Sequence, residues 1–244
     1  MSTLLEEEKR PDSPSENQQA PYAAPYEGKR IAFVHTLGAL APVFDQLVAE
    51  HLPGAVATHV VDDGFYEAEF AVGALDETEQ RRLVEHLNHG EAAEADISVV
   101  TCSFLGTYVD ELAHEANGSW LRIDLAMAEA ALAIGDRIGV LATAESSYRS
   151  TVQLLERLAS EAGREVQLSA HLVEGAFTAL ERGDLDTHNS AVADAIASVQ
   201  GEVDVIVLSQ ASMAQAIATM TEQPTVPVLT SPVLCFERLR ELLA

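Results

Sequence analysis

Short apolar runs alternate with amphipathic segments from about residue 29 to the end of the chain. The apolar runs cover residues 30–36, 57–61, 96–103, 121–124, 137–143 and 204–210. Runs of this length, rich in Val, Ile and Leu, are typical of strands that are buried on both faces. Apolar residues recur at helical spacing over residues 42–51, 76–93, 104–116 and 233–243, and again after Ser146 and Ser147. This alternation predicts the α/β class, with parallel sheets flanked by helices.

The strand pattern occurs twice. The run from Arg30 to Thr36 begins with Arg-Ile and ends on Thr, and so does the run from Arg137 to Thr143. The run 96–102 has a similar counterpart in 204–210, and both matches have an offset of 107 or 108 residues. We infer a duplication that gives two similar, flavodoxin-like parallel-sheet halves facing each other.

We expect three regions along the chain. Residues 1–28 carry a charge run and several prolines without any apolar period, which predicts a disordered tail. The first half covers residues 29–124 together with 225–244, because the amphipathic C-terminal helix is expected to return to it. The second half covers residues 125–224.

Cys102 lies where the run 96–103 ends and the next predicted helix begins. Open α/β sheets keep their ligand sites at this end of their strands. A helix N-terminus also favours thiolate over thiol. The alternative is an inert core cysteine, since free cysteines are often buried. Cys235, on the C-terminal helix, is expected to serve packing.

Duplication brings the strand ends of the two halves together in one cleft. Position 102 of the first half then faces position 210 of the second, which is a glutamine. Thr36 and Thr143 form a second pair on the neighbouring strands. We therefore expect a pseudo-symmetric cleft with Cys102 and Gln210 as opposite walls.

Composition narrows the classes of partner. The formal charge of −25 argues against nucleic acid, which binds clustered Lys and Arg. No apolar run has the ~18 residues of a membrane span, and the N-terminus lacks the layout of a secretory signal. Glycine-rich phosphate loops and sets of metal ligands at characteristic spacing are absent from the sequence. We expect a cytoplasmic protein with no membrane partner, no cofactor and no metal, acting on a small molecule.

Four motifs follow one another along the chain: residues 100–103 (Val-Thr-Cys-Ser), 139–146 (Gly-Val-Leu-Ala-Thr-Ala-Glu-Ser), 207–213 (Val-Leu-Ser-Gln-Ala-Ser-Met) and 226–232 (Val-Pro-Val-Leu-Thr-Ser-Pro). In this order and spacing they resemble the aspartate/glutamate racemase superfamily, and the resemblance runs from about Lys29 to the C-terminus. It implies a cofactor-independent racemase or isomerase of amino acid metabolism that moves a proton at a carbon α to a carboxylate or carbonyl. A homodimer is also a family expectation.

The resemblance implies a catalytic pair of cysteines, of which Cys102 matches the first. Gln210 occupies the position of the second and has no usable pKa, so it can only hydrogen-bond, for example to an enolate oxygen. Three hypotheses remain: a racemase or isomerase with another second base, His35 being the nearest candidate; a one-cysteine decarboxylase of the arylmalonate type; and a binding protein without catalysis.

Hydroxyl-bearing residues beside the predicted helix N-termini suit a substrate carboxylate. The candidates for substrate binding are Thr36, Ser103, Thr143, Ser146 and Ser212. Thr143 and Ser146 match the family's carboxylate-holding loop.

Overall fold

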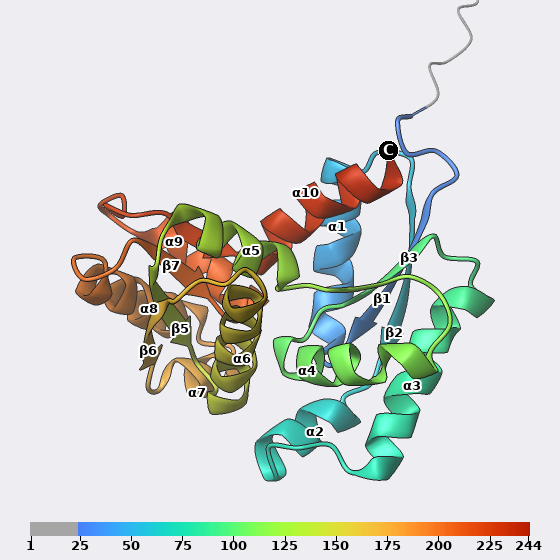
Figure 1. Ribbon diagram of the computed structural model, residues 1–244, viewed down its shortest axis with the longest axis horizontal. Helices are drawn as coiled ribbons and strands as arrows, with labels where there is room; N and C mark the ends of the chain where they lie inside the picture. Colours follow the sequence, from blue (N-terminus) through green and yellow to red (C-terminus); the bar gives the residue numbers. More distant parts are fainter. Residues whose placement is uncertain (1–23) are drawn as a thin grey trace, which may run out of the picture.

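The computed structural model describes residues 24–244, and within them two parallel four-stranded sheets stand side by side (Figure 1). The first sheet has the order β2-β1-β3-β4 and the second has the order β6-β5-β7-β8. The strands are β1 (Arg30–His35), β2 (Val56–Val61), β3 (Ile97–Val100), β4 (Trp120–Arg122), β5 (Arg137–Ala142), β6 (Gln167–Leu172), β7 (Val205–Leu208) and β8 (Val228–Thr230). Two duplicated α/β halves are thus present, as the repeated pattern predicts.

Helices cover both faces of each sheet (Figure 1). They are α1 (Ala41–His51), α2 (Gly64–Ala71), α3 (Glu77–Ala92), α4 (Ser103–Leu112), α5 (Leu125–Ile134), α6 (Glu145–Glu161), α7 (Ala176–Glu181), α8 (Leu185–Val199), α9 (Ala216–Thr219) and α10 (Ser231–Leu243), with short 3₁₀ turns at Gly38–Leu40, Ala113–Glu115 and Ala211–Gln215. No helix of this described range is both long and apolar enough to cross a membrane.

The duplication is visible at the level of single contacts. The backbone N of Arg30 donates to Asp96 Oδ2 at 2.8 Å, and the backbone N of Arg137 donates to Asp204 Oδ2 at 3.0 Å. Asp96 lies just before β3 and holds the start of the neighbouring strand β1, and Asp204 lies just before β7 and holds the start of β5. The shared sequence motif therefore encodes a shared register.

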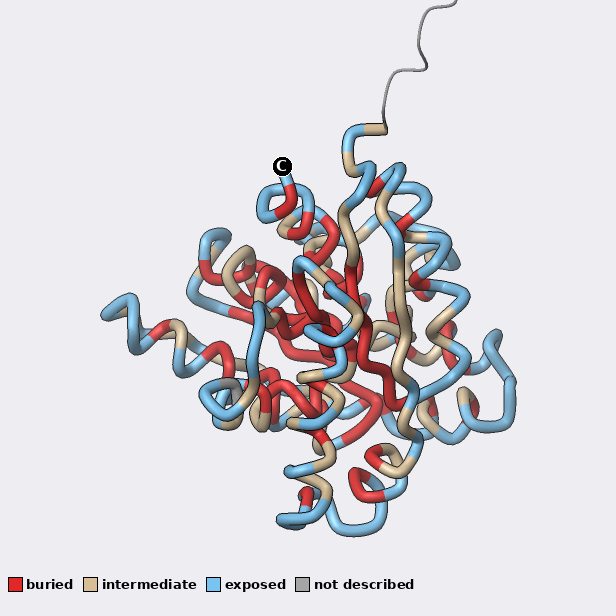
Figure 2. Tube along the Cα trace, turned by 90° about the vertical axis from the view of Figure 1, so that its right-hand side faces the viewer, coloured by how far each residue is buried: buried red, intermediate tan, exposed pale blue. Residues whose placement is uncertain are grey.

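The strands form the buried centre of each half, whereas most helices have one exposed face (Figure 2). Helix α10 leaves the second half and packs on α1, where Cys235, Phe236, Leu239 and Leu243 join the core of the first sheet (Figure 1). Cys235 is a fully buried core residue in this position. Strand β8, however, pairs with β7 in the second sheet. The expected boundary after residue 224 is therefore wrong for residues 228–230, which complete the second sheet before the chain returns.

Two segments differ from expectation. Residues 62–64 (Asp-Asp-Gly) have the composition of a turn, but they lead into helix α2, whose Phe65 and Ala68 are buried. The part of the expected tail that is described, residues 24–28, forms a turn in which Tyr26 N donates to Pro53 O at 3.2 Å. Tyr26 also packs on the first core, and this apolar contact explains the order. The remainder of the expected tail, residues 1–23, lies outside the described residues.

A buried ion pair lies where the first half passes into the second. Arg122 donates from Nε to Asp124 Oδ1 at 2.7 Å and from Nη2 to Asp124 Oδ2 at 3.0 Å. The same guanidinium contacts Asp110 on α4 and Ser150 on α6. Helices from both halves are thereby held to one charged centre.

Candidate active site

A cleft lies between the two halves at the carboxyl ends of their strands. It has a volume of about 70 Å³ and is lined by residues of both halves. Five of the residues singled out in the sequence line it: Thr36, Cys102, Ser103, Gln210 and Ser212. The cleft thus brings positions 102 and 210 together, whereas His35, Thr143 and Ser146 do not line it.

Cys102 is half-buried between the end of β3 and the start of α4. Burial, with a further contribution from the negative charge of Glu69, raises the pKa of the Cys102 thiol to about 12. Interactions with the backbone N–H groups of Leu105 and Phe104 and with Thr36 lower this pKa, but by less. The N–H groups at the start of α4 thus favour the thiolate, as expected, but burial and Glu69 outweigh them, and the thiol is protonated at neutral pH.

Gln210 is held in a fixed orientation by Thr143. The backbone N of Thr143 donates to Gln210 Oε1 at 2.6 Å, and its hydroxyl donates to the same atom at 2.9 Å. An N–H group can only donate, so the atom it meets must be the amide oxygen. The amide N–H₂ of Gln210 is left available to the cleft as a donor. Thr143 thus supports the glutamine, as Thr36 in the other half interacts with Cys102.

Glu69 on α2 is a cleft residue that the sequence did not identify. The residue is 7% exposed, and its Oε2 accepts a hydrogen bond from Cys102 Sγ at 3.9 Å. Its Oε1 accepts from Ser147 at 3.3 Å and also from Ser146, both in the first turn of α6. Burial raises the pKa of Glu69, while these three hydrogen bonds lower it in part. Ser146 and Ser147 bind the carboxylate of Glu69 and do not cap α6, whose N-cap residue is Ala144.

The spacing along α2 contained a signal for Glu69. Phe65, Ala68 and Glu69 are the buried residues of this helix, and they share one face because they are three and four positions apart. A glutamate on the apolar face of a short helix is rarely left buried without a partner. Recognising it required recognising the helix first.

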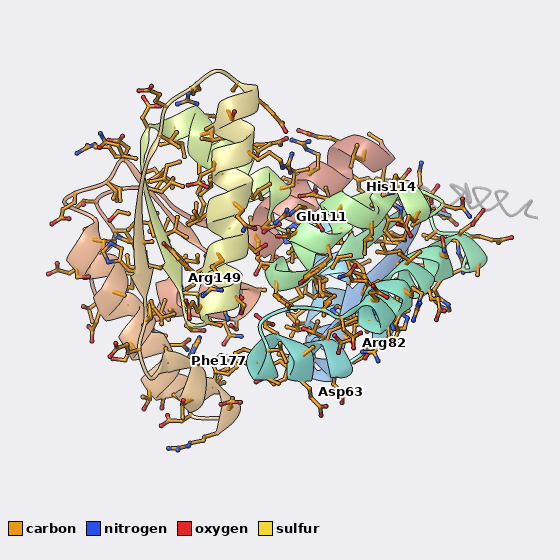
Figure 3. All side chains as sticks on the ribbon, turned by 60° about the horizontal axis from the view of Figure 1, so that its bottom comes forward. Asp63, Arg82, Glu111, His114, Arg149 and Phe177 are labelled. Atoms are coloured by element: carbon orange, nitrogen blue, oxygen red, sulfur yellow. The ribbon has the colours of Figure 1, made fainter. Side chains whose placement is uncertain are left out.

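Aromatic side chains close the cleft between α2 and α7. Phe70 stacks on Phe177 with ring centroids 4.4 Å apart, and Tyr66 lies 6.1 Å from Phe177. The hydroxyl of Tyr66 donates to Glu181 Oε1 at 3.1 Å. Figure 3 shows Phe177 of the second half beside α2 of the first. Helix α2, which carries Glu69, is therefore fastened across the mouth of the cleft.

His35 lies at the end of β1 but is fully buried and directed away from the cleft lining. Its Nδ1 is 2.8 Å from Thr101 Oγ1, which itself donates to Val34 O, and its Nε2 is 2.9 Å from His59 Nδ1. Burial lowers the pKa of His35 to about 4, so the ring is neutral at pH 7. The geometry gives His35 no direct path to a substrate as a second base.

Two serines of the second half line the cleft with unsatisfied hydroxyls. Ser209, after β7, and Ser231, at the start of α10, are each 1% exposed. Neither hydroxyl has a hydrogen-bond partner among residues 24–244. Buried hydroxyls are normally bonded, so two unpaired ones in a cleft suit a polar ligand. Within the same described range, no group of three or more His, Cys, Asp or Glu side chains is arranged to hold a metal ion.

The comparisons with known proteins agree with this geometry. The sequence model of the Asp/Glu/hydantoin racemase family matches residues 22–237. The chain therefore belongs to the Asp/Glu/hydantoin racemase family. No curated protein matches the sequence significantly.

Solved structures of racemases share the fold. A glutamate racemase of Bacillus anthracis superposes with a TM-score of 0.67 at 16% identity, over 89% of this chain and 82% of that one. An allantoin racemase of Klebsiella pneumoniae gives a TM-score of 0.61 at 18% identity, over 88% and 87%. A putative Asp/Glu racemase of Yersinia pestis gives 0.65 at 18% identity, over 88% and 99%. At such identities the likeness concerns the fold, and together with the family it supports a racemase, which is an isomerase.

Proposed function

We propose that the protein is a cofactor-independent racemase or isomerase that moves a proton at a carbon α to a carboxylate or carbonyl. Its substrate is an amino acid or a related small acid, and Cys102 is the acid–base group. The observation that carries this proposal is the position of Cys102 in the cleft, at the carboxyl end of β3 and in contact with a second ionisable group, Glu69.

The remaining lining suits a small acid. The free hydroxyls of Ser209 and Ser231 can donate to a substrate carboxylate, and neither needs to break an existing hydrogen bond. The amide N–H₂ of Gln210 can donate to the oxygen on which charge develops when the α-proton leaves. Since no Lys, Arg or His lines the cleft in the described chain, these uncharged donors carry the recognition.

A one-cysteine decarboxylase is the second candidate, and a particular observation favours it. The titratable residues that line the cleft are Tyr66, Glu69 and Cys102, all from the first half. The second half offers Gln210 and serine hydroxyls, so a two-base inversion lacks its second base. A protonated Cys102 thiol suits the donation of one proton to a carbanion left by loss of carbon dioxide.

The experiment incubates single enantiomers of aspartate, glutamate, allantoin and other hydantoins, as well as prochiral arylmalonates, with wild type and with Cys102→Ala. Circular dichroism follows the loss of optical activity, and released carbon dioxide is measured in parallel. Cys235→Ala is the matched control, because this cysteine is buried in the first core, away from the cleft. Loss of optical activity that requires Cys102 supports the racemase, and release of carbon dioxide that requires Cys102 supports the decarboxylase.

The third possibility is of a different functional class, a protein that binds a small acid without catalysing a reaction. It predicts no turnover of any compound by wild type, together with calorimetric binding of one of them that is equally tight in Cys102→Ser. That pair of results would overturn both catalytic proposals.

A further inference from the structure

Glu69 and Cys102 are two ionisable side chains in direct contact within one cleft. Cys102 Sγ lies 3.9 Å from Glu69 Oε2, and Glu69 is 7% exposed. The other partners of Glu69 are the hydroxyls of Ser146 and Ser147. A carboxylate in such a place loses most of its hydration, and its hydrogen bonds offset this cost only in part, since the pKa of Glu69 is raised.

A purely mechanical role explains this arrangement less well. Helix α2 is already fastened to the second half by the Phe70–Phe177 stack and by the hydrogen bond from Tyr66 to Glu181. A neutral glutamine at position 69 could accept the same serine hydrogen bonds without the desolvation of a charge. The position of a carboxylate beside the only cysteine of the cleft is typical of paired acid–base groups.

We propose that Glu69 is a catalytic residue that exchanges a proton directly with Cys102, and this inference rests on the proposed function. In the forward step, the S–H bond of Cys102 breaks, an O–H bond forms on Glu69 Oε2, and the negative charge moves from the carboxylate to the sulfur. The thiolate then takes the α-proton, so that an S–H bond forms again and the electron pair of the C–H bond passes to the carbonyl or carboxylate oxygen. Returning the proton reverses these steps, and no oxidant or cofactor is required.

The structure supplies the parts that such an exchange needs. The first turn of the 17-residue helix α6 presents two hydroxyls and the positive end of its dipole to Glu69 while it is ionised. The backbone N–H groups of Phe104 and Leu105, with Thr36, interact with the sulfur and stabilise its thiolate.

The charged and titratable surroundings of the pair are few. Tyr66 on α2 and, through it, Glu181 on α7 are the other ionisable groups near the cleft, and the pKa of Tyr66 is raised to about 12 by burial and by Glu181. His35 is the last residue of β1, does not line the cleft and is neutral at pH 7. Burial raises the pKa of Cys102 most, and Glu69 is the charged group that raises it further.

The first test measures the alkylation of Cys102 by iodoacetamide between pH 7 and about 11, with peptide mass spectrometry to separate Cys102 from Cys235. The rate reports both access to the sulfur and its protonation, and only protonation makes the rate level off as the pH rises. The wild-type rate should still rise at pH 11, because its thiol has a pKa of about 12. Since removal of the neighbouring charge lowers this pKa, the rate in Glu69→Gln should begin to level off at least one pH unit earlier, within the measured range. Glu69→Asp keeps the charge and should behave like wild type.

Glu67→Gln is the matched control, because Glu67 is an exposed residue of the same helix and the substitution removes the same charge. It should leave the pH profile unchanged. If Glu69→Gln changes the rate by the same factor at every pH, and its rate still rises at pH 11 as in wild type, Glu69 only closes the cleft mechanically and the proposal is wrong.

The second test uses any compound whose α-proton the wild type exchanges with solvent. Glu69→Gln should slow that exchange roughly a hundredfold, as expected for loss of an acid–base group, while Glu69→Asp retains part of it. Exchange at the wild-type rate in Glu69→Gln would overturn the proposal and leave the proposed function standing. If the wild type exchanges no proton with any compound, the proposed function fails, and the catalytic role of Glu69 fails with it. The alkylation profiles then still show whether the two side chains are coupled.

Discussion

Removing Asp124 tests whether the buried ion pair holds the two halves together. The Arg122 side chain is 3% exposed and the Asp124 side chain 0%, and two N–H···O bonds of 2.7 and 3.0 Å join them. Breaking such a pair costs about 3 to 5 kcal/mol, because the remaining charge stays buried without its partner. Asp110 and Ser150 still contact the guanidinium, so we expect the lower end, about 3 kcal/mol, for Asp124→Asn.

For a chain of 244 residues this loss lowers the Tm by roughly 6 to 12 °C. Differential scanning calorimetry at pH 7 measures it. Asp204→Asn is the control, since Asp204 also pairs with an arginine, Arg137, but the two side chains are 32% and 52% exposed. Its Tm should stay close to that of wild type, because exposed pairs contribute little. Equal Tm values for the two variants would refute the reasoning from burial.

Three further predictions follow from the site and the fold. Gln210→Cys places a thiol on the wall of the cleft opposite Cys102, so the number of inversions per exchanged α-proton should rise. Chiral chromatography of reactions in D₂O measures this ratio. An unchanged ratio would contradict the claim that positions 102 and 210 face each other. Burial lowers the pKa of His35 from 6.5 to about 4, so the neutral ring contributes stability at pH 7 that is lost as the pH falls through this range. Urea unfolding between pH 7 and 4 should therefore show a weaker pH dependence for His35→Gln than for wild type, and identical slopes would contradict it. A Cβ at Gly106 would lie 2.5 Å from Arg122 Nη2, so Gly106→Ala should cost about 1 to 3 kcal/mol in thermal unfolding, whereas Gly201→Ala, with no atom within 4 Å, should not.

Most of the fold could be predicted because each strand is a continuous apolar run and each long helix has a clear period. The duplication could be recognised because the repeated residues have the same structural role in both halves. Asp96 and Asp204, for example, each accept a hydrogen bond from the backbone N of the arginine that begins the neighbouring strand. Helix α2 was missed because it has only eight residues and follows Asp-Asp-Gly, a pattern typical of turns. The boundary near residue 224 was misplaced because β8 has only three residues, too few for an apolar pattern.

The site could be predicted only in part. The duplication predicts that Cys102 and Gln210 face each other, because it places the two strand ends that carry them at equivalent positions in the two halves. The protonation of Cys102 depends first on its burial in the folded chain and then on Glu69, which is 33 residues away in the sequence, so no local pattern predicts it. His35 was singled out by its place at a strand end, yet side chains there alternate between the two faces of the sheet, and its partners Thr101 and His59 hold it away from the cleft.

The central claim is that Cys102 moves a proton at a carbon α of a small acid. Solvent deuterium uptake, followed by NMR, tests it most directly, with amino acids, hydantoins and arylmalonates incubated in D₂O with wild type, Cys102→Ala and Cys235→Ala. The account predicts that at least one compound takes up deuterium at its α-carbon with wild type and Cys235→Ala but not with Cys102→Ala. Uptake that persists in Cys102→Ala, or no uptake of any compound by wild type, would contradict it.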